Sequence, residues 1–376
     1  NEATIVNNLI RVEDYGIYIY YYNYYQNIYY NTVKVRDSYA LYIYNGNSNN
    51  ISINNIFYTE STATQAAYYF NTSVVTISDY NDYFSSYDYP IYYSGNRTLS
   101  EMQGFGQDSS SLNINPMFDA DSSLVPTSYI LDNKGAPIAG INDDMYGSTR
   151  SETTPDMGAI EFSVAGSVLS GNYTVGTAGD FDSISNAINS LVIYGVSGPV
   201  TFNILPGTYT EQLTIGEVYG ASSINTLTIQ SSTGDTADVS WQYTPTSSAN
   251  YVLKVNNTDH LTIRNIGFDV SASSSYGTIL EISGETDSLR IEGNEFRGYA
   301  YNSNSANHYL VESTSNAGTG MLFSDNTFLQ GSAGMLLNNG GADDGEFKII
   351  NNTSIGQYFG FWIQSIDSIE VSGNTV

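Results

Sequence analysis

The stretch LRIEGNEF, residues 289–296, decides the fold because the same eight-position phrase returns along the chain. Its other copies in the second half are LTIRNIGF from Leu261, MLFSDNTF from Met321, FKIINNTS from Phe347 and IEVSGNTV from Ile369. An earlier set comprises ATIVNNLI, QNIYYNTV, ISINNIFY and VTISDYND, which begin at Ala3, Gln26, Ile51 and Val75. Within each set the phrases recur every 22 to 32 residues, which is typical of the coils of a solenoid.

Apolar residues alternate with mixed or polar ones at the start of each phrase. Positions one and three are mostly apolar, and this alternation predicts a short strand with one buried face. The third positions are therefore expected to form two internal columns. These are Ile5, Ile28, Ile53 and Ile77 in the early set, and Ile263, Ile291, Phe323, Ile349 and Val371 in the late set.

Position six of the phrase is usually asparagine, often preceded by Gly, Asp or Asn, which is typical of a sharp turn. The residues concerned are Asn8, Asn31, Asn294, Asn326, Asn352 and Asn374. Stacked one coil above another, their amides would satisfy turn carbonyls and each other. We therefore interpret them as an internal structural ladder and not as a ligand site.

The intervals between phrases are too short for crossover helices, and all copies run in the same direction. Successive strands are therefore expected to stack in parallel at about 4.8 Å per coil. The fold class that follows is all-β, a parallel β-helix.

Two tandem modules are predicted from breaks in the repeat. Residues 1–162 form the C-terminal part of one module with an irregular cap at about 98–162, and residues 163–172 form a linker. Residues 173–376 form the N-terminal part of a second module, which opens with a capping helix in DFDSISNAINSLVIYG, N-capped by Asp180. Both ends are expected to be cut from something longer, since the chain opens directly on a repeat phrase and stops within one.

Charge and composition narrow the classes of partner. The chain has 376 residues with 11 basic and 38 acidic side chains, a formal charge of −27, and no cysteine. This charge repels polyanions, so nucleic acid and anionic membranes are disfavoured. No apolar run approaches the length of a membrane span, and without cysteine neither disulfides nor thiol chemistry contribute.

Tyrosine is concentrated in the second strand column of the early coils, in GIYIYYYNYY from Gly16, ALYIYNG from Ala40, AAYYFN from Ala66 and PIYYSG from Pro90. In the first two, alternation predicts that Ile and Leu point inward while Tyr18, Tyr20, Tyr42 and Tyr44 point outward. One interpretation is aromatic stacking that stiffens an exposed sheet. The other is a flat platform for sugar rings or for a neighbouring protein.

The stretches TTPDMGAIEF (153–162), TVGTAGDFDSISNAINSL (174–191) and GPVTFNILPGTYTEQLTI (198–215), together with the asparagine-turn coils, support a resemblance. The chain resembles the right-handed parallel β-helix repeat proteins of secreted bacterial surface proteins, within the pectin-lyase-like superfamily. That resemblance implies a right-handed β-helix, an extracellular or cell-surface location, and export, often by type IX secretion. The fold itself carries lyases, hydrolases and adhesins alike.

No residue is assigned a catalytic role. Arg264 is expected one coil below Glu292, and Lys348 one coil below Glu370, as stacked surface ion pairs. The acidic clusters, among them Asp79 and Asp82, fall in predicted turns or caps, where solvated carboxylates are ordinary. One such turn, with Asp343, Asp344 and Glu346, is a candidate calcium site, although no EF-hand loop supports it.

These observations favour a non-enzymatic segment of a tandem β-helix surface protein, acting as an adhesin or extracellular fibre. Its expected partners are neutral glycans, surfaces, other surface proteins or further β-helix modules. One alternative is a carbohydrate-binding or polysaccharide-degrading protein that acts on neutral glycans. Another is a structural filament subunit that associates with itself.

Overall fold

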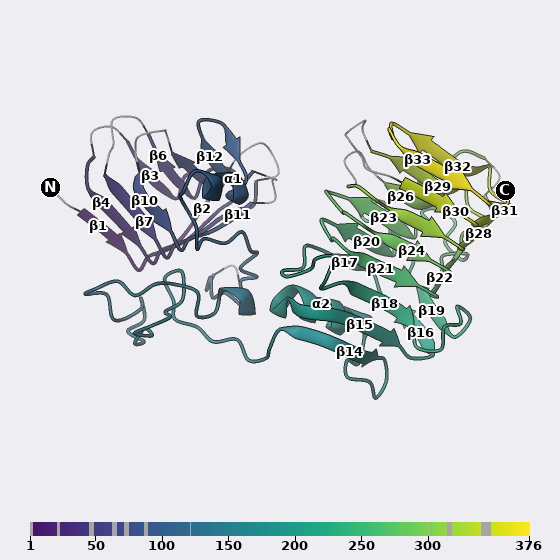
Figure 1. Ribbon diagram of the computed structural model, residues 1–376, viewed down its shortest axis with the longest axis horizontal. Coiled ribbons are helices and arrows are strands. Elements are labelled where there is room, and N and C mark those ends of the chain that lie inside the picture. Colours follow the sequence, from purple (N-terminus) through teal and green to yellow (C-terminus); the bar gives the residue numbers. More distant parts are fainter. Residues whose placement is uncertain are drawn as a thin grey trace. The chain divides into compact units, whose positions relative to one another are not determined.

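The structure is a computed structural model in which the chain divides into two compact units, Asn1–Ser167 and Val168–Val376. Each unit is a solenoid of parallel strands (Figure 1). Together the described residues of the two units make about 12 turns and contain very few helices. The predicted parallel β-helix is therefore confirmed. The described residues are 3–20, 23–44, 49–61, 66–70, 75–85, 89–120, 122–301, 303–313, 318–339 and 347–376.

Three sheets run along the first unit. The first contains β1 (Ala3–Val6), β4 (Gln26–Tyr29), β7 (Asn50–Ile53) and β10 (Val75–Asp79). The second contains β2 (Leu9–Val12), β5 (Thr32–Val35), β8 (Ile56–Thr59) and β11 (Asp82–Ser85). The third contains β3 (Ile17–Ile19), β6 (Leu41–Ile43), β9 (Tyr68–Phe70), β12 (Ile91–Tyr93) and the antiparallel edge strand β13 (Asn96–Arg97).

The second unit also has three parallel sheets. The first contains β14 (Leu169–Val175), β15 (Val196–Ile204), β18 (Leu227–Ser231), β21 (Leu261–Arg264), β24 (Arg290–Glu292), β27 (Leu322–Ser324), β30 (Phe347–Ile350) and β33 (Ile369–Ser372). The second contains β16 (Gly207–Thr210), β19 (Val239–Gln242), β22 (Gly267–Asp269), β25 (Glu295–Arg297), β28 (Thr327–Leu329) and β31 (Thr353–Ile355). The third contains β17 (Leu213–Ile215), β20 (Leu253–Asn256), β23 (Leu280–Ser283), β26 (Tyr309–Ser313), β29 (Ala333–Asn338) and β32 (Phe359–Gln364).

The helices of the described residues are α1 (Leu99–Gly104), α2 (Ile184–Tyr194) and the 3-10 turns η1 (Tyr129–Leu131) and η2 (Ala306–His308). None in the described part of the chain is long and apolar enough to cross a membrane. The predicted capping helix is present as α2, which packs on β14, β15 and β17.

The predicted N-cap of α2 is wrong. Ser183, not Asp180, caps the helix and accepts a hydrogen bond from the backbone N–H of Asn186. Asp180 instead accepts from the backbone N–H and the hydroxyl of Thr174, at 2.7 and 2.8 Å. It therefore fixes the turn that follows β14. Because β14 already begins at Leu169, the last residues of the predicted linker are strand; the two-module organisation itself stays a prediction.

The register of the late coils agrees with the predicted column. Ile263 pairs with Ile291, Ile291 with Phe323, Phe323 with Ile349 and Ile349 with Val371. The first four side chains are buried, whereas Val371 in the last coil is 48% exposed.

The predicted early column is correct for Ile5 and Ile28. Its third and fourth members are each wrong by one residue. Ile28 pairs with Ser52 and Ser52 with Ser78. Ile53 instead pairs with Tyr29, and Ile77 with Ile51, so these two residues lie in the two columns on either side. Ile77 is accordingly 44% exposed, and Ser52 and Ser78 are buried. A shift of one residue turns every side chain of a strand to its other face. Alternation of apolar residues misled the prediction here because serine takes the inward position.

Each unit has its own asparagine ladder, which joins successive coils of that unit. In the second unit, each Nδ2 donates to the Oδ1 of the asparagine one coil on, from Asn294 to Asn326, to Asn352 and to Asn374, at 3.2, 3.0 and 3.1 Å. The same Oδ1 atoms accept the backbone N–H of the preceding asparagine at 2.7 to 2.9 Å. The first unit repeats the arrangement at 2.8 to 3.0 Å through Asn8, Asn31, Asn55 and Asn81. The predicted structural ladder is confirmed.

A second column fills the core beside the ladder. Trp241, Phe268, Phe296 and Phe328 are buried and stack with ring centroids 5.4, 5.2 and 5.0 Å apart. Offset-stacked rings at this separation attract beyond the contribution of their buried area. The aromatic stack and the ladder thus hold the same coils in the same register.

We expect Asn326→Ala to lower the free energy of unfolding by about 1–3 kcal/mol, because it leaves buried turn groups without hydrogen-bond partners. Chemical denaturation of the variant measures the loss. Asn189→Ala is the matched control, since Asn189 lies on the exposed side of α2 and alanine is the better helix former. Equal denaturation midpoints for the two variants would contradict a stabilising contribution from the ladder.

Candidate functional site

Eight tyrosines cover the outer side of the third sheet of the first unit. We call this set the tyrosine face: Tyr15, Tyr18, Tyr20, Tyr39, Tyr42, Tyr44, Tyr69 and Tyr92. The strands place them there by alternation, because Ile17 and Ile19 of β3 are buried while Tyr18 is 48% exposed. In β6, Leu41 and Ile43 are likewise buried and Tyr42 is half-buried. The structure thus brings together the four tyrosines expected from the sequence.

Parallel register makes tyrosine stack on tyrosine. Tyr18 pairs with Tyr42, Tyr42 with Tyr69 and Tyr69 with Tyr92. Their ring centroids are 4.9, 4.3 and 4.5 Å apart, with interplanar angles of 9 to 12°. The faces of the inner rings are therefore covered by one another, and what reaches the surface is ring edges and hydroxyls. A sugar cannot stack on the π face of such a ring without separating the column.

The face has a second repeat across the column. Tyr20 stacks on Tyr44 at 5.2 Å, and these two lie beside Tyr18 and Tyr42 at 5.6 and 6.0 Å. On the other side Tyr15 meets Tyr18 edge-on, at 5.0 Å and 73°. Edge-to-face and offset contacts are both favoured arrangements of aromatic rings. The tyrosines consequently brace each other as a two-dimensional array.

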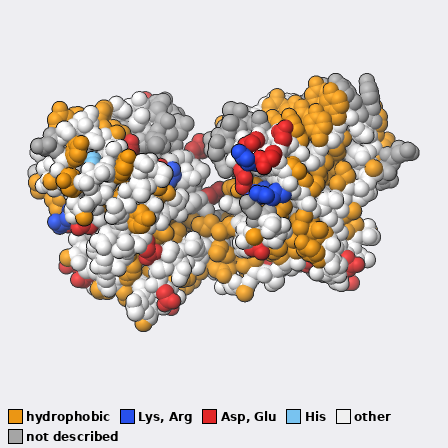
Figure 2. All heavy atoms as spheres, turned by 180° about the vertical axis from the view of Figure 1, so that it is seen from behind, with side chains coloured by type: hydrophobic (Ala, Val, Ile, Leu, Met, Phe, Trp, Pro, Cys, Tyr) orange, Lys and Arg blue, Asp and Glu red, His pale blue; other side chains and the backbone are white. Residues whose placement is uncertain are grey.

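The tyrosine face is uncharged at neutral pH. Burial, with the neighbouring hydroxyls, raises the pKa of Tyr42 and of Tyr39 above the ordinary value for tyrosine. At the edge of the sheet the guanidinium of Arg97 is paired with Glu101 at 3.4 Å. Figure 2 shows that side chains of the hydrophobic class, tyrosine included, form broad patches on the pictured side of the molecule, with few basic side chains between them.

Sequence reasoning named four of the eight tyrosines. Tyr69 and Tyr92 each lie in a Tyr-Tyr pair, and alternation alone does not say which member faces outward; the structure buries Tyr68 and turns Tyr69 out. Tyr15 and Tyr39 precede their strands, where the alternation rule does not apply. The signal that could have found Tyr69 and Tyr92 is the spacing from Tyr42, because register carries the column from coil to coil.

The candidate calcium residues Asp343, Asp344 and Glu346 lie outside the described residues. Among the residues that the structure does describe, no group of three or more His, Cys, Asp or Glu side chains is arranged to hold a metal ion. Calcium binding stays a prediction.

Several acidic residues of the first unit are buried, among them Asp82 and Asp108. Asp82 was expected in a solvated turn but lies within β11, fully buried, where its Oδ1 accepts the backbone N–H of Ile114 at 2.9 Å. Asp108 accepts hydrogen bonds from Ser78, Tyr83 and Ser111 at 2.8 to 3.0 Å. Burial raises the pKa of both carboxyl groups. Enclosed in this way, they satisfy backbone and side-chain donors at the end of the coils and are unsuited to contact a substrate.

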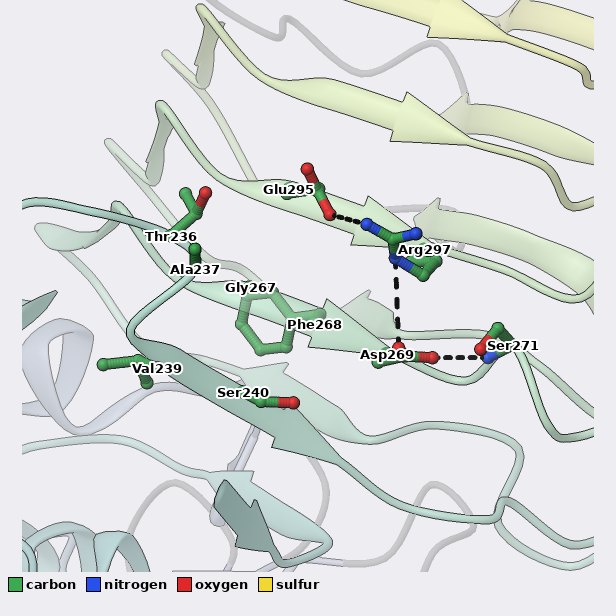
Figure 3. Close-up of a pocket in the computed structure, with 10 residues that line it drawn as sticks. All are labelled: Thr236, Ala237, Val239, Ser240, Gly267, Phe268, Asp269, Ser271, Glu295 and Arg297. Atoms are coloured by element: carbon green, nitrogen blue, oxygen red, sulfur yellow. Dashed lines mark hydrogen bonds and ion pairs between the residues drawn. The ribbon is translucent and has the colours of Figure 1, made fainter. Parts of the chain in front are cut away.

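A hollow of about 350 Å³ lies on the second sheet of the second unit (Figure 3). Gly267 is one of its lining residues, and a side chain there would come within 2.6 Å of the carbonyl oxygen of Thr236. Arg297 crosses one wall and contacts Glu295 at 2.5 Å and Asp269 at 3.9 Å. Asp269 also accepts the backbone N–H of Ser271 at 2.7 Å. The hollow is polar and its two carboxylates share one guanidinium.

The predicted ion pair between Arg264 and Glu292 is not formed, although the two residues are in register. The Nε of Arg264 donates to Gln230 at 2.6 Å, and Glu292 pairs instead with Arg290 at 2.8 Å. Lys348 is in register with Glu370, as expected. These contacts lie at the surface, where single ion pairs contribute little to stability.

Two glutamates are stacked on the third sheet of the second unit, and among the described residues only one of them pairs with a lysine. Lys254, Glu281 and Glu312 occupy one column, and Lys254 pairs with Glu281 at 2.7 Å. Burial, together with the charge of Glu281, raises the pKa of Glu312 to about 6. Glu312 is therefore a partly desolvated carboxylate whose charge disfavours the fold.

No protein-family model and no curated protein sequence matches the chain. Among solved structures, the chain is similar to the deglycosylated pectin methylesterase from Aspergillus niger, with 15% identity over 57% of this chain and 77% of that one, at a TM-score of 0.33. It is also similar to a mutant of the PL6 family alginate lyase AlyGC, with 10% identity over 100% of this chain and 69% of that one, at a TM-score of 0.21. Similarities this weak decide nothing about activity.

We expect Glu312→Gln to stabilise the second unit at neutral pH. The folded-state pKa of about 6 lies above the ordinary value of 4.5, so the wild type keeps its full stability below pH 4.5 and loses part of it as the pH rises through 6. The melting temperature of the variant should exceed that of the wild type above this window and match it below. Glu285→Gln, at an exposed position, serves as control. A difference in melting temperature between Glu312→Gln and the wild type that does not depend on pH would refute the raised pKa of Glu312.

Proposed function

We propose that the chain is a segment of an extracellular surface or fibre protein, and that its tyrosine face makes non-catalytic attachments to neutral partners. The observation that carries the proposal is the array itself: eight tyrosines, four of them paired in register, on one uncharged sheet face of a chain with a formal charge of −27. The sequence resemblance to secreted bacterial surface proteins supports the same assignment.

Tyrosine suits attachment because one end of the side chain is apolar and the other carries a hydroxyl. Its stacking in columns adds a second advantage. Rings already held by neighbours at 4.3 to 5.2 Å lose little further rotamer freedom on binding, so less of the interaction energy is spent on ordering them. A contact surface of this kind is pre-organised before the partner arrives.

A second candidate function is binding or cleavage of neutral glycans at the hollow between Gly267 and Arg297. Carboxylates and hydroxyls are the groups that bind sugar hydroxyls, and a pair of carboxylates is the usual catalytic requirement for glycoside hydrolysis. Here, however, one arginine contacts both carboxylates. A catalytic pair needs one proton donor and one acceptor in different environments, and attachment is therefore the function that we favour.

We expect the fourfold variant Tyr18→Ser, Tyr20→Ser, Tyr42→Ser and Tyr44→Ser to bind at least about tenfold more weakly to neutral glycans, abiotic apolar surfaces or the protein itself, a loss of ~1.4 kcal/mol. The coils should stay folded, because the four side chains lie outside the core. Binding is measured on glycan arrays and coated surfaces, and circular dichroism reports folding.

The matched control replaces Tyr146, Tyr219 and Tyr358 with serine, since these are exposed tyrosines that lie outside the tyrosine face. It should bind like the wild type. If the folded fourfold variant bound as well as the wild type, the tyrosine face would not be the attachment site. Turnover of a neutral polysaccharide by the wild type would instead establish the second candidate.

A further inference from the structure

We infer that the partner of the tyrosine face is the same face of a second copy of this chain, so that two copies associate face to face. The inference rests on the proposed function and names its partner. It depends on four properties of the described residues: the repeat distance of the tyrosines, the geometry of their rings, the distribution of charge and the exposed area.

The repeat distance favours a copy of the same solenoid. Tyrosine rings recur along the column at 4.9, 4.3 and 4.5 Å, which follows the spacing of parallel strands. A partner can engage successive ring edges only if its own surface repeats at the same distance. A second copy does so by construction, and tightly packed interfaces between identical side-chain ladders are the basis of steric zippers.

The ring geometry points the same way. Since the π faces of the inner rings are covered by one another, a partner meets ridges of ring edges and hydroxyls, separated by the 5.6 and 6.0 Å steps between columns. The same surface of a second copy presents the same edges and hydroxyls, so the contact is self-complementary about a two-fold axis. Hydroxyls of the two copies can then donate to and accept from each other.

Charge restricts where two copies can approach. At a formal charge of −27, copies repel each other over most of their surface. The outward residues Tyr18, Tyr42, Tyr69 and Tyr92 form a strip without charge, so the repulsion there comes only from more distant groups. Salt screens that repulsion, and association through this face should consequently strengthen with ionic strength.

The exposed area sets the expected strength. Tyr15, Tyr18 and Tyr20 are 42%, 48% and 49% exposed, and the other five are half-buried. With about 150–250 Å² for a whole tyrosine side chain, the tyrosine face offers roughly 500 Å² per copy. Two copies would bury about 1,000 Å², the lower end for a specific interface. The dimer is therefore weak and dependent on concentration.

The test is sedimentation of the full chain from roughly micromolar to millimolar concentration, at low and high salt. We expect a dimer that grows with concentration and with salt. Tyr42→Glu places a charge at the centre of the face and should weaken dimerisation by at least about tenfold. Tyr42→Phe keeps the ring and should retain the dimer, and Tyr146→Glu, at an exposed site outside the face, should have no effect.

Circular dichroism of each variant checks folding, and Tyr42→Phe provides a folded comparison if the glutamate variant is unstable. A dimer that is insensitive to Tyr42→Glu, or that weakens as salt is added, would overturn the inference. A chain that stays monomeric while the fourfold serine variant loses attachment to glycans or apolar surfaces would also overturn it, yet leave the proposed function intact. A fourfold serine variant that keeps both dimerisation and attachment would refute the inference and the proposed function together.

Discussion

Vertical register between coils is the constraint on which the rest of the structure depends. Each asparagine of the ladder, such as Asn326, donates to the next asparagine at 3.0 Å and to the carbonyl of Ile291 at 2.7 Å. A coil displaced by one residue would break these buried hydrogen bonds and turn its apolar side chains outward. The ladder therefore fixes the register of each coil against the next. The side chains of the other columns are aligned as a result, from the buried stack of Phe296 and Phe328 to the exposed tyrosines.

How far the sequence predicts this register depends on which residue marks it. In the late coils the apolar third position and the asparagine agree, and the column through Ile291 was predicted correctly. In the early coils Ser52 faces inward between two isoleucines, so hydrophobic alternation and the asparagine disagree. The asparagine was the better guide there, since a buried amide needs specific partners whereas serine is tolerated on either face.

The candidate site shows the same difference between local and long-range information. Tyr18 and Tyr42 could be assigned outward because isoleucine and leucine flank them within one strand. Tyr69 could not, since its neighbour Tyr68 is equally aromatic and only pairing with the adjacent coils separates buried from exposed. Asp82 was misplaced for a related reason: the pattern suggested a turn, whereas the neighbouring Asn81 of the ladder sets the start of β11.

The same register that stabilises the fold also determines what the tyrosine face can recognise. Stacking at 4.3 Å covers the π faces of Tyr42 and Tyr69, so recognition of a single sugar ring by stacking is sacrificed for rigidity. What remains exposed is a periodic surface of ring edges and hydroxyls. Each tyrosine contributes little binding energy, and the regular spacing of the tyrosines provides the specificity. Such a surface distinguishes partners by spacing along the solenoid axis, and a partner without that spacing engages only a few of its tyrosines.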